Sequence, residues 1–282
     1  MLPALVHART ISIPSASPVS GCEKDRQDEK SLHGDGDEPV NFLLGSFVSF
    51  DIIAAASTRS CPILEVDHRL VLEKLGIDLN HLTACENWVM ILIFEISLLD
   101  KWKKEAQNAY ELSIVELAKR GGQIRERLRR SLADLDNTPS TGLSPSNMSK
   151  TYSGRNHLET TKIFALSAMT YLNVVLSGAN PTLPEIVESV SDTIAAFTVM
   201  TDLNLLRNLV WPFCITGCLA SEGKYDIFRG FICAANTKER DLGTCAEAFE
   251  IIEECWRLRK AGSRGCDWAF VMEKLGRYIP LV

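Results

Sequence analysis

The spacing of apolar residues along the chain predicts helices. From Asn41, the stretch NFLLGSFVSFDIIAAAS places Leu43, Phe47, Phe50 and Ala54 three or four residues apart, the spacing of one apolar helix face. Comparable stretches recur to the end of the chain, and none alternates apolar with polar residues as a half-buried strand does. The sequence therefore predicts an all-α array of about nine or ten helices.

Segments rich in turn formers and charge divide this pattern. Residues 1–39 contain Ser, Pro, Gly and alternating charge with few apolar groups, a composition typical of a flexible leader. The stretch DNTPSTGLSPSNMSK lacks an apolar period and predicts an exposed loop near residues 136–156. Gly121-Gly122 predicts a break between two helices. Residues 40–282 are thus expected to form a helical domain in two halves.

Composition narrows the classes of function. Hydrophobic residues make up 46% of the 282-residue chain and charged residues 23%, as in ordinary globular proteins. A formal net charge of −6 argues against binding nucleic acid through bulk electrostatics. The most apolar run, WVMILIFEISLL from Trp88 to Leu99, falls short of the roughly 20 residues that cross a bilayer. We expect a buried helix there and no membrane contact.

Two cysteines in LRNLVWPFCITGCLA are the strongest candidates for reactive chemistry. If the segment is helical, Cys214 and Cys218 lie one turn apart and could hold one edge of a zinc ion, which needs two further ligands. The opposing interpretation is a core helix, because apolar surroundings disfavour the thiolate. We favour core packing, with a kink or helix start at Pro212 and a close helix approach at Gly217.

A basic run, KRGGQIRERLRR, also has two interpretations. It could be a nuclear-import signal or a phosphate contact. Alternatively it is a solvated helix face, which is the more common role of such runs and the one that we favour. The residues concerned are Lys119, Arg120, Arg125, Arg127, Arg129 and Arg130.

Catalytic and metal-binding motifs are missing from the sequence. It contains no G-x-S-x-G nucleophile elbow, no phosphate-binding G-x-x-x-x-G-K and no H-E-x-x-H zinc motif. Its five histidines stand far apart, and no two have metal-ligand spacing. We therefore predict that the chain is not an enzyme and holds no cofactor or metal.

Several blocks of sequence, taken together, resemble the fungal-specific transcription factor domain. This domain is the regulatory region of fungal zinc binuclear cluster regulators. The likeness runs from about Asn41 to Val282 and includes FVSFDIIAAASTRSCP, CENWVMILIFEISLL, KIFALSAMTYLNVVLSGANP, LRNLVWPFCITGCLA, GTCAEAFEIIEECWRLR and DWAFVMEKLGRYIPLV. Within these blocks the signature residues are Asp51, Trp88, Trp211, Pro212, Gly217, Trp256 and Trp268.

The resemblance implies an all-α regulatory domain located in the nucleus that controls a metabolic gene cluster. Its expected partners are other regulators or a second copy of the chain, with a small-molecule effector. The family's DNA-binding module needs six cysteines near the N-terminus, whereas only Cys22 precedes Cys61 here. DNA contact is therefore expected only indirectly or through a module outside this chain, and zinc only with such a module.

Two alternatives to a regulator stay open at this point. One is a helical enzyme of fungal secondary metabolism whose reactive residues meet only in three dimensions. The other is an interaction scaffold that does not bind DNA and stays outside the nucleus. Two origins of the short leader also stay open: a gene model that lacks its first exon, or a natural protein that acts by dimerising with a complete regulator.

Overall fold

A computed structural model describes residues 38–64, 66–74, 76–137, 148–200, 202–236, 243–279 and 281. Residues 1–37 of the predicted leader, with Cys22, lie outside these residues, whereas its last two residues, Glu38 and Pro39, belong to the first helix. Every regular element in the described part is helical, with eleven α-helices and two 3₁₀ segments, so the expected all-α class is confirmed. The elements are α1 (Glu38–Thr58), α2 (His68–Lys74), α3 (Asn80–Thr83), α4 (Asn87–Asn108), α5 (Ile114–Asn137), α6 (Met148–Ser177), α7 (Pro184–Val199), η2 (Leu203–Asn208), α8 (Val210–Leu219), η3 (Glu222–Lys224), α9 (Tyr225–Asn236), α10 (Thr244–Lys260) and α11 (Trp268–Leu275).

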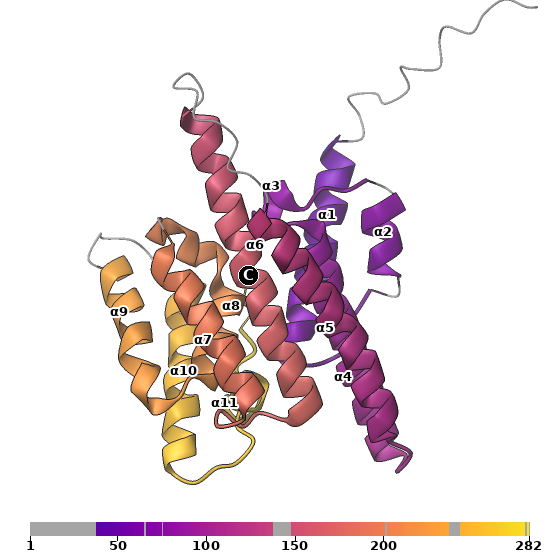
Figure 1. Ribbon diagram of the computed structural model, residues 1–282, viewed down its shortest axis with the longest axis vertical. Coiled ribbons are helices and arrows are strands. Elements are labelled where there is room, and N and C mark those ends of the chain that lie inside the picture. Colours follow the sequence, from indigo (N-terminus) through magenta and orange to yellow (C-terminus); the bar gives the residue numbers. More distant parts are fainter. Residues whose placement is uncertain are drawn as a thin grey trace, which may run out of the picture. The chain divides into compact units, whose positions relative to one another are not determined.

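Helix α6 is the central element of the unit formed by residues 38–282. It packs on α4 and α5 on one side and on α7 and α8 on the other (Figure 1). Helix α1 packs on α4, and α8 packs on α10. Near the end of the chain, α11 returns to contact α1, so the two halves of the sequence share one core.

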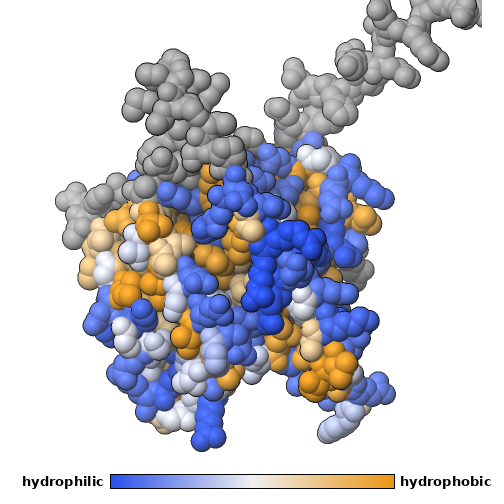
Figure 2. Space-filling model, viewed as in Figure 1, coloured by the Kyte–Doolittle hydropathy of each residue, from blue (hydrophilic) through white to orange (hydrophobic). Residues whose placement is uncertain are grey.

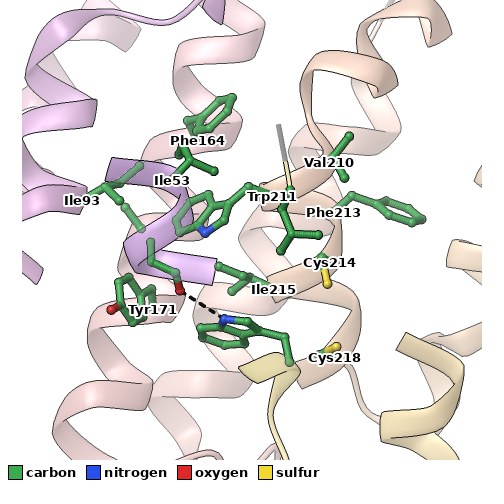
Figure 3. Close-up of a cluster of buried hydrophobic side chains, with 14 of the residues drawn as sticks. Ile53, Ile93, Phe164, Tyr171, Val210, Trp211, Phe213, Cys214, Ile215 and Cys218 are labelled. Atoms are coloured by element: carbon green, nitrogen blue, oxygen red, sulfur yellow. Dashed lines mark hydrogen bonds between the residues drawn. The ribbon is translucent and has the colours of Figure 1, made fainter. Parts of the chain in front are cut away.

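Helix α8 lies inside this core, because all ten of its residues are buried. Trp211 is fully buried, and its ring stacks on Phe164 with centroids 5.9 Å apart. Figure 3 shows Trp211 directed toward Ile53 and Phe164. Pro212 falls in the first turn of α8, where backbone N–H groups have no partner within the helix. The helix start expected at this proline is confirmed.

Two expectations about chain breaks are wrong in detail. Helix α5 continues to Asn137 and α6 begins at Met148, so the loop predicted near residues 136–156 is at most residues 138–147, which lie outside the described part. Gly121-Gly122 does not separate helices, because α5 runs through both. A Cβ on Gly121 would come within 2.5 Å of Leu176 Cδ2, so this glycine permits α5 to approach α6.

The apolar face that the sequence predicts for α1 is not the face that this helix buries. Leu43, Phe47 and Phe50 are more than half exposed, and α1 buries other positions, such as Val48 and Ile52. Among the described helices, α1 is long and apolar enough to cross a membrane by length and composition, with a mean hydropathy of 1.6. Half of that stretch is buried inside the protein.

Gly217 allows α8 and α10 to touch, as the sequence predicts. A Cβ at this position would lie 2.5 Å from Cδ1 of the fully buried Ile252. We expect Gly217→Ala to lower the free energy of unfolding by about 1–3 kcal/mol through overpacking. The control is Gly122→Ala, where a Cβ meets nothing within 4 Å and should stabilise by about 0.5–1 kcal/mol.

Urea unfolding followed by circular dichroism measures both changes. Combining Gly217→Ala with Ile252→Ala should cost less than the sum of the two single changes, because the smaller side chain makes room for the new methyl group. Equal effects of Gly217→Ala and Gly122→Ala would show that the helix contact is loose.

Candidate functional site

The two cysteines of α8 belong to a buried group of thiols. Cys214 and Cys218 project from the same side of the helix (Figure 3). Cys255 Sγ of α10 lies 3.6 Å from the Cys218 carbonyl oxygen and 3.6 Å from Cys266 Sγ. Burial, together with the Cys214 thiol, raises the pKa of Cys218 far above its usual range. The thiolate that a metal or an oxidant needs is therefore scarce at neutral pH.

The pKa of Cys255 is raised as well, by its hydrogen bond with Cys218 and by burial. Within the described ranges, no group of three or more His, Cys, Asp or Glu side chains has a geometry that could hold a metal ion. The structure thus supports core packing for these cysteines.

Replacing Cys214 and Cys218 together with alanine should leave the metal content of the purified protein unchanged. The cost should be in stability, about 1–3 kcal/mol in total, from lost packing in the core. Metal analysis by mass spectrometry and a thermal melt measure the two quantities. Stoichiometric zinc in the wild type that disappears in the double variant would contradict this interpretation.

The six residues of the basic run lie on α5, over which Figure 2 shows strongly hydrophilic side chains. Two of them bind neighbouring helices. Arg125 Nη2 donates to Asn173 Oδ1 of α6 at 3.0 Å, and Arg127 pairs with Glu95 of α4. These two arginines therefore help to dock α5 on the rest of the unit.

Two other arginines of the run pair along α5 itself. Arg120 Nε lies 2.7 Å from Glu116 Oε1, and Arg130 Nη2 lies 3.3 Å from Glu126 Oε1. The hydrogen bond from Arg120 holds the pKa of Glu116 below its usual value. The remaining members, Lys119 and Arg129, are exposed. Four of the six side chains thus pair with groups on the protein's own surface, as side chains on a solvated helix face do.

Asp51 organises the segment that follows α1. Its Oδ1 accepts a hydrogen bond from the Ile63 amide at 2.7 Å, and its Oδ2 accepts one from the Leu64 amide at 3.0 Å. The fully buried His68 places Nε2 2.8 Å from Asp51 Oδ2 and Nδ1 2.8 Å from the Val66 carbonyl oxygen. Both ring nitrogens of His68 thus face acceptor oxygens, one on α1 and one on the segment before α2. This pairing fixes α2 against α1.

Arg59 connects three distant parts of the chain. Its Nε and Nη2 donate to the two carboxylate oxygens of Asp100 at 3.0 and 2.7 Å, and its Nη1 donates to Asp267 Oδ2 at 2.6 Å. Burial lowers the pKa of Arg59, but the hydrogen bond with Asp100 and the charge of Asp267 outweigh it and raise the pKa above its ordinary value. Asp267 also caps α11 by accepting from the Phe270 amide at 2.9 Å.

Two surface hollows in the described part differ in size and in the residues that line them. One, of about 150 Å3, lies beside α1 and is mainly apolar, with Phe50, Ile53, Met90 and Phe164 in its wall. The other, of about 410 Å3, lies between the loop after α6 and the loop after α10. Its lining includes the two arginines Arg259 and Arg264, the polar Asn180, Thr182 and Ser263, and no carboxylate.

The residues that the resemblance singles out lie in or beside the core. Trp256 Nε1 donates to the Gly217 carbonyl oxygen at 2.8 Å, and Trp268 Nε1 donates to the Ala56 carbonyl oxygen at 3.2 Å. Trp88 is half-buried against the core. Their role as a family signature stays a prediction. Sequence reasoning did not identify His68, or Arg59 with its two partners. Arg59 is 41 residues from Asp100 and 208 residues from Asp267, so no local pattern indicates this network.

Comparison with known proteins identifies the class to which this all-α unit belongs. The family model of the fungal specific transcription factor domain matches residues 16–282, so the chain belongs to this family. The family and the relatives below are regulators of transcription rather than enzymes, in agreement with the sequence-based prediction. No solved structure matches the chain.

The chain is similar to the trichothecene biosynthesis transcription regulator TRI10 of Trichoderma arundinaceum, at 34% identity over 84% of this chain and 52% of the relative. The Fusarium sporotrichioides regulator of the same name is 29% identical over 98% of this chain and 64% of that protein. The ustiloxin B cluster transcription factor ustR of Aspergillus flavus is 29% identical over 69% of this chain and 34% of that protein. The chain spans between a third and two thirds of these relatives.

Proposed function

We propose that this chain is a regulatory domain that controls transcription of a fungal gene cluster for secondary metabolism. The observation that carries the proposal is the family match over residues 16–282, joined to relatives named as regulators of trichothecene and ustiloxin B clusters. In the described part, Arg59 and the buried Asp100 and Asp267 pair with one another, so these charges stabilise the fold rather than form a reactive site.

Deleting the gene and measuring cluster transcripts and metabolites together tests this proposal. We expect transcripts of several neighbouring genes to change as a group, and reintroduction of the wild-type gene to restore them. Normal transcripts with accumulation of one intermediate would contradict the regulator and favour a helical enzyme. An upstream in-frame exon encoding six cysteines would show how a complete regulator contacts DNA.

We infer that the protein works in the nucleus, with other regulators or a second copy of itself as partners. The family match supports this location in general terms. Acidic net charge and the absence of a six-cysteine module from this sequence favour DNA contact through a partner or through a module outside this chain.

Nuclear accumulation should survive replacement of Arg125, Arg127, Arg129 and Arg130 with glutamine. The reason is that three of these four already bind groups of the protein's own surface. A fluorescent fusion measures the location, with a second variant, Arg229→Gln and Arg257→Gln, as the control for lost surface arginines. Cytoplasmic accumulation of the quadruple variant alone would show that the basic run is the import signal. A wild-type fusion that stays cytoplasmic under inducing conditions would favour a scaffold outside the nucleus.

The larger hollow is our proposed place for a small-molecule effector. Arg259 Nη1 donates to the Ala220 carbonyl oxygen at 3.3 Å, and its Nη2 lies 3.1 Å from Cys255 Sγ, which fixes the guanidinium at the wall of the hollow. With Arg264 beside it and no carboxylate in the lining, this hollow favours a compound that carries a carboxylate or phosphate.

A further inference from the structure

The small hollow beside α1 has an apolar floor that the fold holds in place. Ile53 of α1, Met90 of α4 and Phe164 of α6 line the hollow, and all three are buried members of the core. Phe164 also stacks on the fully buried Trp211, and Figure 3 shows this ring beside Ile53 and Phe164. Because packing on the core fixes each floor side chain, the hollow is formed before a ligand arrives, as most small-molecule sites are.

The size of the hollow matches a single aromatic ring. Its volume is about 150 Å3. An engineered apolar cavity of the same volume in an unrelated protein binds benzene, so a ring of this size fits the hollow. Phe50, which is 53% exposed, lines the outer part and adds an aromatic surface against which a second ring can pack. The hollow therefore favours a monocyclic aromatic compound.

Two polar side chains of η2, Arg207 and Asn208, line the same hollow and are exposed. Neither forms an ion pair or a side-chain hydrogen bond with any residue in the described ranges, whereas Arg59 and Arg127 are paired with carboxylates. Among the described residues that line the hollow, none is a carboxylate. The hollow thus places an unpaired guanidinium beside a ring site, and a guanidinium binds a carboxylate through charge-assisted hydrogen bonds.

Hydroxyl groups in the lining have already given their protons to the backbone. Ser46 Oγ donates to the Phe42 carbonyl oxygen at 2.8 Å, and Ser49 Oγ donates to the carbonyl oxygen of Ser46 at 3.0 Å. On α3, Thr83 Oγ1 donates to the Leu79 carbonyl oxygen at 3.1 Å. A hydroxyl that donates its proton keeps its lone pairs as acceptors. The wall therefore accepts hydrogen bonds, which favours a ligand with a hydroxyl group of its own.

We propose that the small hollow is a binding site for a monocyclic aromatic carboxylic acid, with a ring hydroxyl as a further anchor. The ring lies on the floor formed by Ile53, Met90 and Phe164, the carboxylate pairs with Arg207, and the ring hydroxyl donates to a hydroxyl of the wall. The bound acid joins α1 to α6 and η2, so it stabilises the folded state by linkage. This site is separate from the larger hollow and does not rest on the regulator role, since binding is measured on the purified chain.

Titration of the full chain with benzoate, the hydroxybenzoates and phenol, followed by the NMR signals of each compound, tests the proposal. We expect benzoate to bind with a dissociation constant on the order of 1 mM, and the best hydroxybenzoate isomer to bind about 3–10-fold more tightly. Phenol lacks the carboxylate and should bind about 10-fold more weakly than that isomer. Arg207→Gln should weaken the binding of the acids about 10-fold and leave that of phenol unchanged, because only the acids use the guanidinium.

Two further variants complete the test. Ser46→Leu fills the hollow from α1 and should abolish the binding of every compound, with circular dichroism to verify that the variant folds. Arg264→Gln, in the larger hollow, is the matched control and should bind the acids as wild type does. The absence of saturable binding to wild type would overturn the proposal. Acid binding that is lost in Arg264→Gln but kept in Arg207→Gln would overturn it as well, because the acids would then occupy the larger hollow.

Discussion

Replacing Arg59 with alanine should lower the free energy of unfolding by about 3–5 kcal/mol. The substitution leaves Asp100 and Asp267 without their shared cation, and their side chains are only 2% and 5% exposed. Lys104 Nζ remains 3.2 Å from Asp100 Oδ2, so Asp267 is the carboxylate left without a cation. The substitution removes the ion pairs that join the end of α1 to α4 and to the start of α11.

Two further variants give this prediction its controls. Arg59→Lys keeps the charge but cannot bridge both carboxylates with a planar fork, so its cost should lie between wild type and alanine. Arg130→Ala removes an exposed pair on α5 and should cost at most about 1 kcal/mol. Urea unfolding measures all three. If Arg59→Ala and Arg130→Ala cost the same, the buried network contributes nothing beyond a surface ion pair.

Replacing Trp211 with alanine should cost about 3–5 kcal/mol, because the core cannot collapse around so large a void. The ring is fully buried, with Phe164 stacked at 5.9 Å and Tyr171 edge-on at 6.2 Å between centroids. In a domain of this size the loss corresponds to a drop in melting temperature of roughly 6–20 °C.

Trp211→Phe is the matched variant for this position. The indole Nε1 has no hydrogen-bond partner within the described part of the chain, so phenylalanine removes a polar group that is costly to bury. We therefore expect Trp211→Phe to cost less than half of the alanine change. A thermal melt in which both variants lose the same stability would show that the ring's size is unimportant.

Much of the helical architecture follows from local sequence. Apolar spacing predicts the helices, and Pro212 predicts the start of α8, because both act within one or two turns. The same spacing does not reveal which side of a helix is covered. On α1 the regular stripe through Phe47 is exposed, while the buried side includes the polar Ser49 and Asp51.

The glycines and charges show where local sequence is insufficient. Gly121 is a contact point with Leu176, which only the packing of α5 on α6 reveals. Arg59 binds two carboxylates that are distant from it in the sequence, so no sequence motif indicates the network. The burial of Cys214 and Cys218 in α8 could be predicted, because their neighbours in the sequence are apolar.

The most direct test of the central claim joins this chain to an unrelated DNA-binding domain and measures transcription of a reporter that carries its site. If the chain is a regulatory domain, the fusion should change reporter transcripts relative to the DNA-binding domain alone. The Arg59→Ala fusion should lose that change as its fold weakens, and the Arg130→Ala fusion should retain it. Reporter transcription that is the same with and without the chain would contradict the account.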